Sequence, residues 1–353
     1  QLLEMGIDIS SGKINQILIE GKESFHAEKE DILSAGLEVS DYVNVDDTGA
    51  RHKGRNGYCT HIGNELFAWF ESTESKSRIN FLTLLRGKQT DYVLNQEALD
   101  YMQAHKLPKK VLQSLDALAG KNLPDLQTWE ATLNRLGITT KRHVQIATEG
   151  ALLGSILEHG LNKDIVILSD DAGQFNVFLH ALCWIHAERT INKLVGFNEQ
   201  QRDALNSVRD QLWSFYGDLN AYKEDPSPTK KEDLEQRFDQ LFTTETCFAS
   251  LNLALEKIYD NKSELLLVLR RPEIPLHNNL SENDIREYVK RRKISGGTRS
   301  DPGRKARDTF TSLKKTCRKL GISFWEFLQD RLSGQNTISR LGDCIRQKAK
   351  APG

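Results

Sequence analysis

The sequence lacks the features that define membrane-spanning and exported proteins. No stretch approaches the roughly 18 to 20 consecutive apolar residues that a transmembrane helix needs. The chain starts at Gln1 and shows neither the charged nor the apolar region of a signal peptide. We therefore expect a fragment of a longer protein with no membrane partner.

Cysteine is scarce and irregularly placed. The five cysteines are an odd number, lie far apart and form no Cys-x-x-Cys pair. This pattern suggests neither a disulfide framework nor an all-cysteine zinc site, and it favours a reducing cytoplasm.

The chain also lacks an overall excess of charge, because its net charge is −1. That average hides a strong local imbalance. The segment from Arg286 to Lys319 contains thirteen Lys and Arg residues and three Asp and Glu residues. Its net charge is therefore +10, and that of the rest of the chain is −11. A basic run is often only a solvated face, but here Gly296 and Gly297 would let backbone N–H groups approach a phosphate. We predict a surface that binds an anion, such as the phosphate of a larger partner.

At 353 residues the chain exceeds the usual domain size of about 100 to 200 residues. Strand patterns at 42–46, 58–62 and 66–70 are followed by an amphipathic helix, with a turn expected at Asp47-Thr48-Gly49. Four aliphatic residues at 165–168 predict a buried strand, and a helix is expected from Ala172 through His180–His186.

These patterns divide the chain into seven predicted segments. They are 1–40 (remnant of an N-terminal region or linker), 41–87 (first part of the core), 88–162 (mostly helical insertion, with a strand signal at 144–146), 163–189 (core strand and Cys-x-x-His helix), 190–271 (helical insertion), 272–332 (Glu-bearing helix and basic part of the core) and 333–353 (tail).

Three acidic positions stand where chemistry is possible. Asp46 or Asp47 ends the first strand, Asp170 or Asp171 ends the buried strand, and Glu282 lies in the first turn of a late helix. If the two strands are neighbours, these carboxylates converge and need cations to stay ionised. Hard oxygen ligands suit Mg²⁺ or Mn²⁺, and two such ions support phosphoryl transfer. The alternative is ordinary turn and capping chemistry, including a capping box from Asn279 to Glu282.

Taken together, the motifs resemble the DDE transposases of bacterial insertion sequences, of the insertion-sequence-sixty-six type. The resemblance covers roughly 41–87, 163–189 and 265–332. The motifs that carry it are Val45-Asp46-Asp47-Thr48, Asp170 with Phe175, Cys183-Trp184-x-His186-x-x-Arg189, Asn278-Asn279-x-x-Glu282-x-x-x-Arg286, Arg292-Lys293 and Phe324-Trp325-x-Phe327-Leu328. Their order along the chain is more specific than any one of them.

The resemblance implies an α/β fold: a ribonuclease-H-like mixed sheet flanked by helices, with large helical insertions. It implies that Asp46, Asp170 and Glu282 hold two Mg²⁺ or Mn²⁺ ions and catalyse cleavage of element ends and strand transfer. The implied partners are double-stranded DNA at element ends and target, and a second copy of the chain or more. A bacterial, nucleoid-associated location follows. Asp171 and Asn283 depart from the family pattern of Gly and Arg.

Two alternatives remain open: a DNA-binding relative that has lost catalysis, and a ribonuclease-H-like nuclease that only hydrolyses. Cys183 and His186 are expected to support the acids, together with Asn279, although packing or a zinc site with His180 also fits the spacing. The predicted DNA-binding residues are Arg286, Arg291, Arg292, Lys293, Arg299 and Arg304.

Overall fold

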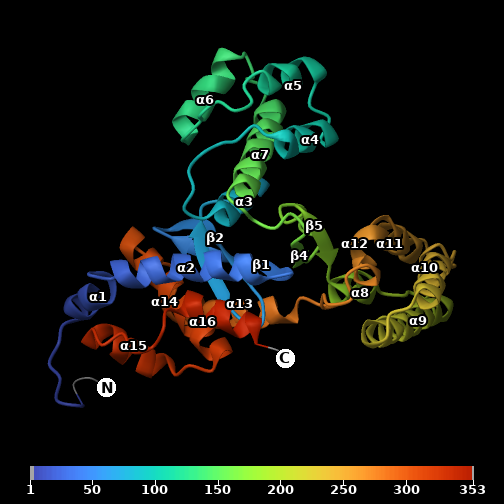
Figure 1. Cartoon of the computed structure of the whole chain (residues 1–353). Helices are drawn as coiled ribbons and strands as arrows, with labels where there is room; N and C mark the ends of the chain where they lie inside the picture. Colours follow the sequence, from blue (N-terminus) through green and yellow to red (C-terminus); the bar gives the residue numbers. More distant parts are fainter. Residues whose placement is uncertain (1–3, 352–353) are drawn as a thin grey trace. The chain divides into compact units, whose positions relative to one another are not determined.

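The computed structural model describes residues 4–351 and contains a five-stranded mixed sheet flanked by helices (Figure 1). The strands are β1 (Tyr42–His52), β2 (Arg55–Gly63), β3 (Ala68–Thr73), β4 (Val166–Ser169) and β5 (Leu179–Leu182). Their order in the sheet is β3-β2-β1-β4-β5. The pairs β1–β4 and β4–β5 are parallel, and β2–β3 is antiparallel. The predicted mixed α/β sheet is thereby confirmed.

The chain folds into two compact units. The second unit consists of Asp41–Val45 and Asp164–Glu282, and the first unit contains the remaining described residues. Strand β1 crosses from one unit to the other at Val45, and helix α13 (Asn279–Ser295) crosses after Glu282. Each unit is described below by itself.

The first unit holds β2, β3, most of β1 and the helices that precede residue 164 or follow residue 282. Its helices are α1 (Ser11–Ile19), α2 (Glu23–Val39), α3 (Arg78–Arg86), α4 (Gln96–Ala104), α5 (Lys109–Asp116), α6 (Leu126–Arg135), α7 (Lys141–Glu158), most of α13, α14 (Asp301–Leu320), α15 (Phe324–Ser333) and α16 (Leu341–Lys350). Helices α2 and α14 pack against β3, and α16 packs against α2. Residues 88–162 are helical, as their periodicity predicts.

Helix α14 closes the free edge of β3 through a ladder of side chains. Thr316, Ser312 and Asp308 accept hydrogen bonds from the backbone N–H groups of Ala68, Phe70 and Ser72 at 3.2, 2.9 and 2.8 Å. Four residues of a helix rise about 6 Å and two residues of a strand about 6.6 Å, so the two spacings match. The edge N–H groups are therefore satisfied without another strand.

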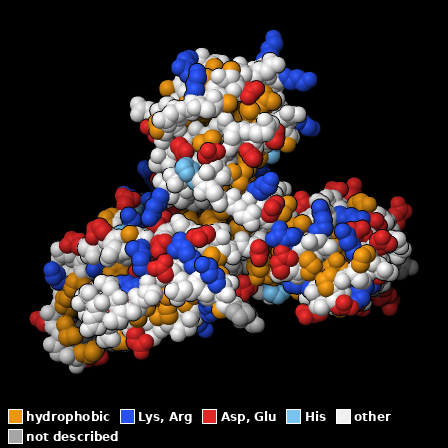
Figure 2. Space-filling view, viewed as in Figure 1, with side chains coloured by type: hydrophobic (Ala, Val, Ile, Leu, Met, Phe, Trp, Pro, Cys, Tyr) orange, Lys and Arg blue, Asp and Glu red, His pale blue; other side chains and the backbone are white. Residues whose placement is uncertain are grey.

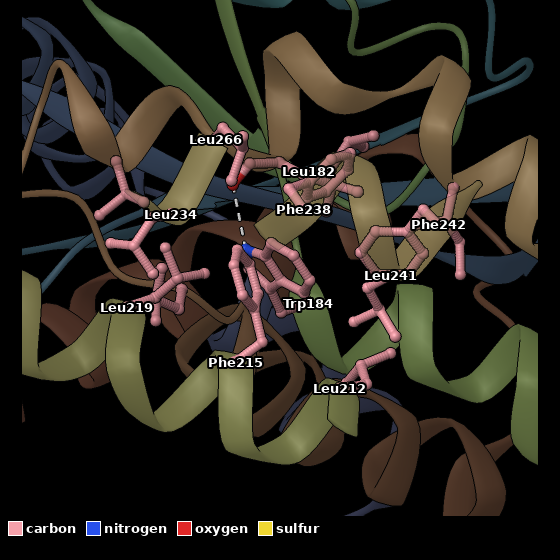
Figure 3. Packing of buried hydrophobic residues seen from close by; sticks show 14 of the residues in the cluster. Leu182, Trp184, Leu212, Phe215, Leu219, Leu234, Phe238, Leu241, Phe242 and Leu266 are labelled. Atoms are coloured by element: carbon pink, nitrogen blue, oxygen red, sulfur yellow. Dashed lines mark hydrogen bonds between the residues drawn. The ribbon is translucent and has the colours of Figure 1, made fainter. Parts of the chain in front are cut away.

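The second unit has its own apolar core. Its helices are α8 (Trp184–Asn192), α9 (Glu199–Glu224), α10 (Pro228–Phe242), α11 (Ala249–Asp260) and α12 (Lys262–Leu265), followed by a 3₁₀ turn, η1 (Leu267–Leu269). Figure 3 shows Trp184 of α8 among side chains of α9 and α10, including Phe215 and Phe238. Its indole N–H donates to the Leu265 carbonyl at 3.0 Å. One tryptophan therefore joins α8 to the helical segment that follows it.

The predicted end of the first strand was wrong. β1 continues through Asp47-Thr48-Gly49 to His52, and the turn falls at Lys53 and Gly54, whose φ angles are +49° and +77°. The loop after α13 pairs with the last residue of β1, because Thr298 forms a parallel bridge with His52. Backbone pairing along β1 overrides the local turn preference of Asp-Thr-Gly.

Two other local predictions were also wrong. Residues 179–182 form strand β5 rather than a helix, because they pair in parallel with β4, and α8 starts only at Trp184. His180 and His186 therefore do not share a helix, which removes the helical spacing considered for a zinc site. The strand signal at 144–146 lies inside α7, where Ile146 is buried.

Among residues 4–351 no helix combines the length and the apolar character that crossing a bilayer requires. Figure 2 shows acidic and basic side chains intermingled over the surface of α9–α11. That part of the surface thus presents no field of one sign.

Asp308 predicts an unusual pH dependence of stability. Burial raises the pKa of this carboxyl from 3.8 to about 7. Because the folded protein holds the proton more tightly than the unfolded chain, this group's stabilising contribution is complete below pH 4 and is lost as the pH rises toward 7. The asparagine in Asp308→Asn does not titrate. Between pH 4 and pH 8 the free energy of unfolding of the wild type should therefore fall by about 2–4 kcal/mol relative to that of Asp308→Asn.

Urea denaturation at several pH values measures this difference directly. The exposed Asp116→Asn serves as the control and should follow the wild type. A constant gap between Asp308→Asn and the wild type across the pH range would contradict the prediction.

Candidate active site

The carboxylate of Glu282 is held by an arginine of the Cys-x-x-His helix. Glu282 is the fourth residue of α13 and Arg189 lies on α8, both in the second unit. Arg189 Nη1 donates to Glu282 Oε1 at 3.2 Å and Nη2 donates to Oε2 at 3.3 Å. Such two-pronged pairing fixes the plane of the carboxylate as well as its position. Glu282 is thus oriented by α8.

His186 lies against the same pair. Its Nε2 is 3.0 Å from Arg189 Nη1 and 3.6 Å from Glu282 Oε1. Burial lowers the pKa of His186, and Arg189 lowers it further, against the opposing fields of Glu282 and Asp170. The ring is therefore neutral near pH 7, so Nε2 accepts from Arg189 and Nδ1 carries the proton. Within the described part of the chain, Nδ1 has no hydrogen-bond partner.

The adjacent acids Asp170 and Asp171 have different partners. Asp170 directly follows β4, and its Oδ1 accepts from the Ala172 N–H at 3.1 Å. Asp171 is half exposed and forms an ion pair with Lys257 of α11 at 2.9 Å. Both aspartates line the same cavity as His186 and Arg189. The second unit therefore brings Asp170, His186, Arg189 and Glu282 together.

Asp46 and Asp47 belong to the first unit, within β1. Asp46 Oδ1 accepts from the Asp47 N–H at 2.7 Å, and Asp47 Oδ1 is 3.9 Å from Lys76 Nζ. Both residues are partly buried. The alternative that Asp47 is simply a turn residue is wrong, because the strand runs on to His52.

Asn278 is the residue that anchors the start of α13. It is 1% exposed, and its Nδ2 donates to the Val45 carbonyl at 2.7 Å while its Oδ1 accepts from Asn44 Nδ2 at 2.8 Å. Its backbone N–H donates to Cys183 Sγ at 3.2 Å. Within the second unit it therefore links the first residues of β1 to the start of α8, four positions before Glu282.

Cys183 fits the hydrogen-bonding interpretation better than the zinc interpretation. Its side chain is buried, and burial raises the pKa of the thiol. A zinc ligand must be a thiolate, which this environment disfavours. Across residues 4–351, no group of three or more His, Cys, Asp and Glu side chains is arranged to hold a metal ion.

Asn279, predicted as a supporting residue, lies exposed at the first position of α13, so that role stays a prediction. The sequence did not predict two contacts of the site. They are the hydrogen bonds of the Asn278 amide and the pairing of the Arg189 guanidinium with Glu282. Both residues stand in the motifs that carry the resemblance. No local pattern signals their contacts, because each partner is distant in sequence.

The predicted DNA-binding residues fall into two groups. Arg286, Lys293 and Arg299 are exposed. The others have partners inside the first unit: Arg291 donates to Thr311 and pairs with Glu287, Arg292 donates to the Gly49 carbonyl, and Arg304 pairs with Asp301. The second group therefore has structural contacts besides any contact with DNA.

The glycine loop approaches a strand. A Cβ on Gly297 would lie 2.4 Å from the Arg51 carbonyl oxygen. Thr298 N–H donates to that same oxygen at 2.9 Å, and Lys53 N–H donates to the Thr298 carbonyl at 2.8 Å. Gly297 is thus needed for backbone docking against β1, which is a different use from the expected approach to a phosphate.

Comparison with known proteins identifies the class. The model of the transposase IS66 family matches residues 166–306, a range that contains Asp170, Cys183, His186, Arg189 and Glu282. The chain is also 45% identical over 322 residues to "Uncharacterized protein y4jO" of Sinorhizobium fredii (strain NBRC 101917 / NGR234), an alignment that covers 90% of this chain and all of that protein. The chain belongs to the transposase IS66 family. No solved structure matches it.

Asn278 and Asn279 provide a matched pair of variants for the anchoring role. We expect Asn278→Ala to lower the free energy of unfolding by about 1–3 kcal/mol, because the buried Val45 carbonyl and Asn44 amide lose their partner. Asn279→Ala should stay within about 0.5 kcal/mol of the wild type, as exposed substitutions usually do. Thermal and urea unfolding compare the two. Equal losses would show that the buried amide has no special role.

Proposed function

We propose that the chain is the catalytic part of a DNA transposase with a ribonuclease-H-like core, in which Asp46, Asp170 and Glu282 form the acidic triad. The observation that carries the proposal is the convergence of Arg189 and His186 on Glu282, with Asp170 lining the same cavity. These residues come from three separate parts of the chain. Membership of the transposase IS66 family supports DNA as the substrate.

The strand register supports the choice of aspartates. Asn44 of β1 pairs with Leu168 of β4, and Asp46 and Asp170 each follow their paired residue by two positions. Side chains two residues apart on a strand share a face. The Asn44 side chain contacts Asn278, four residues before Glu282, so the face of β1 that Asn44 shares with Asp46 favours Asp46 over Asp47 in the proposed triad. Asp170 is favoured over Asp171 because Asp171 is paired with Lys257.

The donor chemistry fits Mg²⁺ or Mn²⁺, because the proposed ligands are carboxylate oxygens. When bound, two such ions would supply the charge that activates the attacking oxygen and stabilises the leaving oxygen of a phosphodiester. Both oxygens of Glu282 accept from Arg189, so Arg189 contributes the neutralising charge at this carboxylate. His186 and Arg189 orient Glu282, and Asn278 holds its helix.

The first test is Glu282→Gln. The amide keeps the size of the side chain but removes its charge, so we expect DNA binding to persist while cleavage is abolished. Mn²⁺ should also stabilise the variant less than the wild type, since an ion that binds only the folded state stabilises it by about 2.7 kcal/mol at 100 times its Kd. Glu287→Gln, which removes an ion-paired carboxylate from the same helix, is the control.

The outcomes of this test separate the alternatives. Cleavage by purified Glu282→Gln would remove Glu282 from the triad. Cleavage without joining of DNA ends by the wild type would favour a nuclease that only hydrolyses. DNA binding with neither cleavage nor stabilisation by Mn²⁺ would favour a relative that has lost catalysis.

The exposed basic residues give a second test. We expect replacement of Arg286, Lys293 and Arg299 by Ala to weaken duplex binding and to lower the slope of log affinity against log salt by up to about 0.9 for each phosphate that the variant no longer neutralises. The control variant replaces three exposed lysines that lie outside the basic segment 286–319, namely Lys109, Lys110 and Lys121. Fluorescence anisotropy at several salt concentrations measures both. Equal salt slopes for the two triple variants would contradict a DNA clamp here.

A further inference from the structure

The second unit contains a pocket of about 450 Å³ beside Asp170, His186 and Arg189. We call it the α8–α11 pocket, and its floor and rim are defined by Leu182, Ile258, Leu265, Arg189, Lys193 and Lys257. Its volume is in the range of pockets that bind small organic groups.

The helical segment 190–271 builds much of this pocket. Lys193, Lys257, Ile258 and Leu265 come from that segment, whereas Arg189 belongs to α8. The segment between the second and third acidic positions therefore has a structural role of its own. It contributes a wall to the cavity that Asp170 and His186 also line.

The floor of the pocket is part of a packed core. Leu182, Ile258 and Leu265 are each less than 10% exposed. Trp184, which is 1% exposed, fixes the Leu265 backbone through its indole hydrogen bond (Figure 3). The apolar floor is therefore preformed, and binding there needs little rearrangement.

The rim carries three cations, Arg189, Lys193 and Lys257, and the two carboxylates of Asp170 and Asp171. Lys257 pairs with Asp171 and Arg189 pairs with Glu282, whereas Lys193 is exposed. The surrounding surface of α9–α11 mixes both signs (Figure 2), so the positive groups of the rim act locally. The cations of the rim outnumber its carboxylates by one, and Lys193 is exposed there. An apolar floor beside such a lysine suits a ligand with a flat apolar part and an anionic part, which describes a nucleotide.

We propose that the α8–α11 pocket receives one unpaired nucleotide of the DNA strand next to the reacting phosphate. The base lies on the floor formed by Leu182 and Ile258, and the phosphate lies at Lys193 and Lys257. Taking a base out of the stack costs a few kcal/mol and costs least where the strand is already single. The inference rests on the proposed function, because it assigns part of that site's substrate.

Lys257 and Thr190 provide the variants. Lys257→Ala removes an exposed rim charge, and Thr190→Phe narrows the pocket from α8, where Thr190 is only partly buried. Lys230→Ala is the matched control, because Lys230 is also an exposed lysine in an ion pair, 2.7 Å from Asp225, and does not line the pocket. None of these residues belongs to the proposed triad.

The probe is a single-stranded oligonucleotide of about ten residues with 2-aminopurine at successive positions, titrated into the full chain. We expect Lys257→Ala and Thr190→Phe to bind it about tenfold more weakly and to lose the 2-aminopurine signal, while Lys230→Ala matches the wild type. Tenfold corresponds to about 1.4 kcal/mol, the size of one hydrogen bond to a charged group. Binding of a fully paired duplex should change little.

Three outcomes would overturn the inference. The first is unchanged oligonucleotide binding and signal in both pocket variants. The second is binding of free deoxyadenosine monophosphate as tight as that of the oligonucleotide, which would make the pocket a mononucleotide site. The third is binding of an acidic peptide that depends on Lys257 while the oligonucleotide does not bind. Failure of the proposed function is separate, because it would appear as cleavage by Glu282→Gln whatever the pocket variants do.

Discussion

A single buried amide fixes the geometry around Glu282. Asn278 satisfies the Val45 carbonyl, pairs with Asn44 and donates its own backbone N–H to Cys183. An unpaired buried polar group costs about 1–3 kcal/mol, so each of these contacts offsets a penalty that burial would otherwise impose. The start of α13 is thereby placed against β1 and α8, and the position of Glu282 follows from it.

Charge is balanced inside the site before any ligand arrives. Arg189 neutralises Glu282. Burial lowers the pKa of His186, and the same guanidinium lowers it further. Asp170 and Asp171 both line the cavity with His186, but only Asp171 forms an ion pair with Lys257, whereas Asp170 accepts from the Ala172 N–H. The two neighbouring aspartates therefore differ in environment, although they are identical in chemistry and adjacent in sequence.

Local patterns predicted much of the fold but few of its contacts. The aliphatic run at 165–168 predicted β4, which lies one residue further along the chain, at Val166–Ser169. A strand that is buried on both faces is recognisable in sequence because its residues are all apolar. The end of β1 and the strand at 179–182 were mispredicted, because pairing with distant segments overrides local preference. Ordered motifs marked Asp170 and Glu282 as site residues, a role that remains to be tested. They could not reveal that Asn278, rather than Asn279, is the buried residue, because burial depends on β1, more than 200 residues earlier.

The second unit couples stability to the site through Trp184. The helices α9 and α10 bury apolar surface around this indole, and the indole in turn fixes Leu265 at the floor of the α8–α11 pocket. Because α8 also carries His186 and Arg189, the packing that stabilises the helical segment sets the distance between the pocket and Glu282. The helical segment thus has a physical reason to lie between the second and third acidic positions, because it packs against Trp184 of α8, the helix that carries His186 and Arg189.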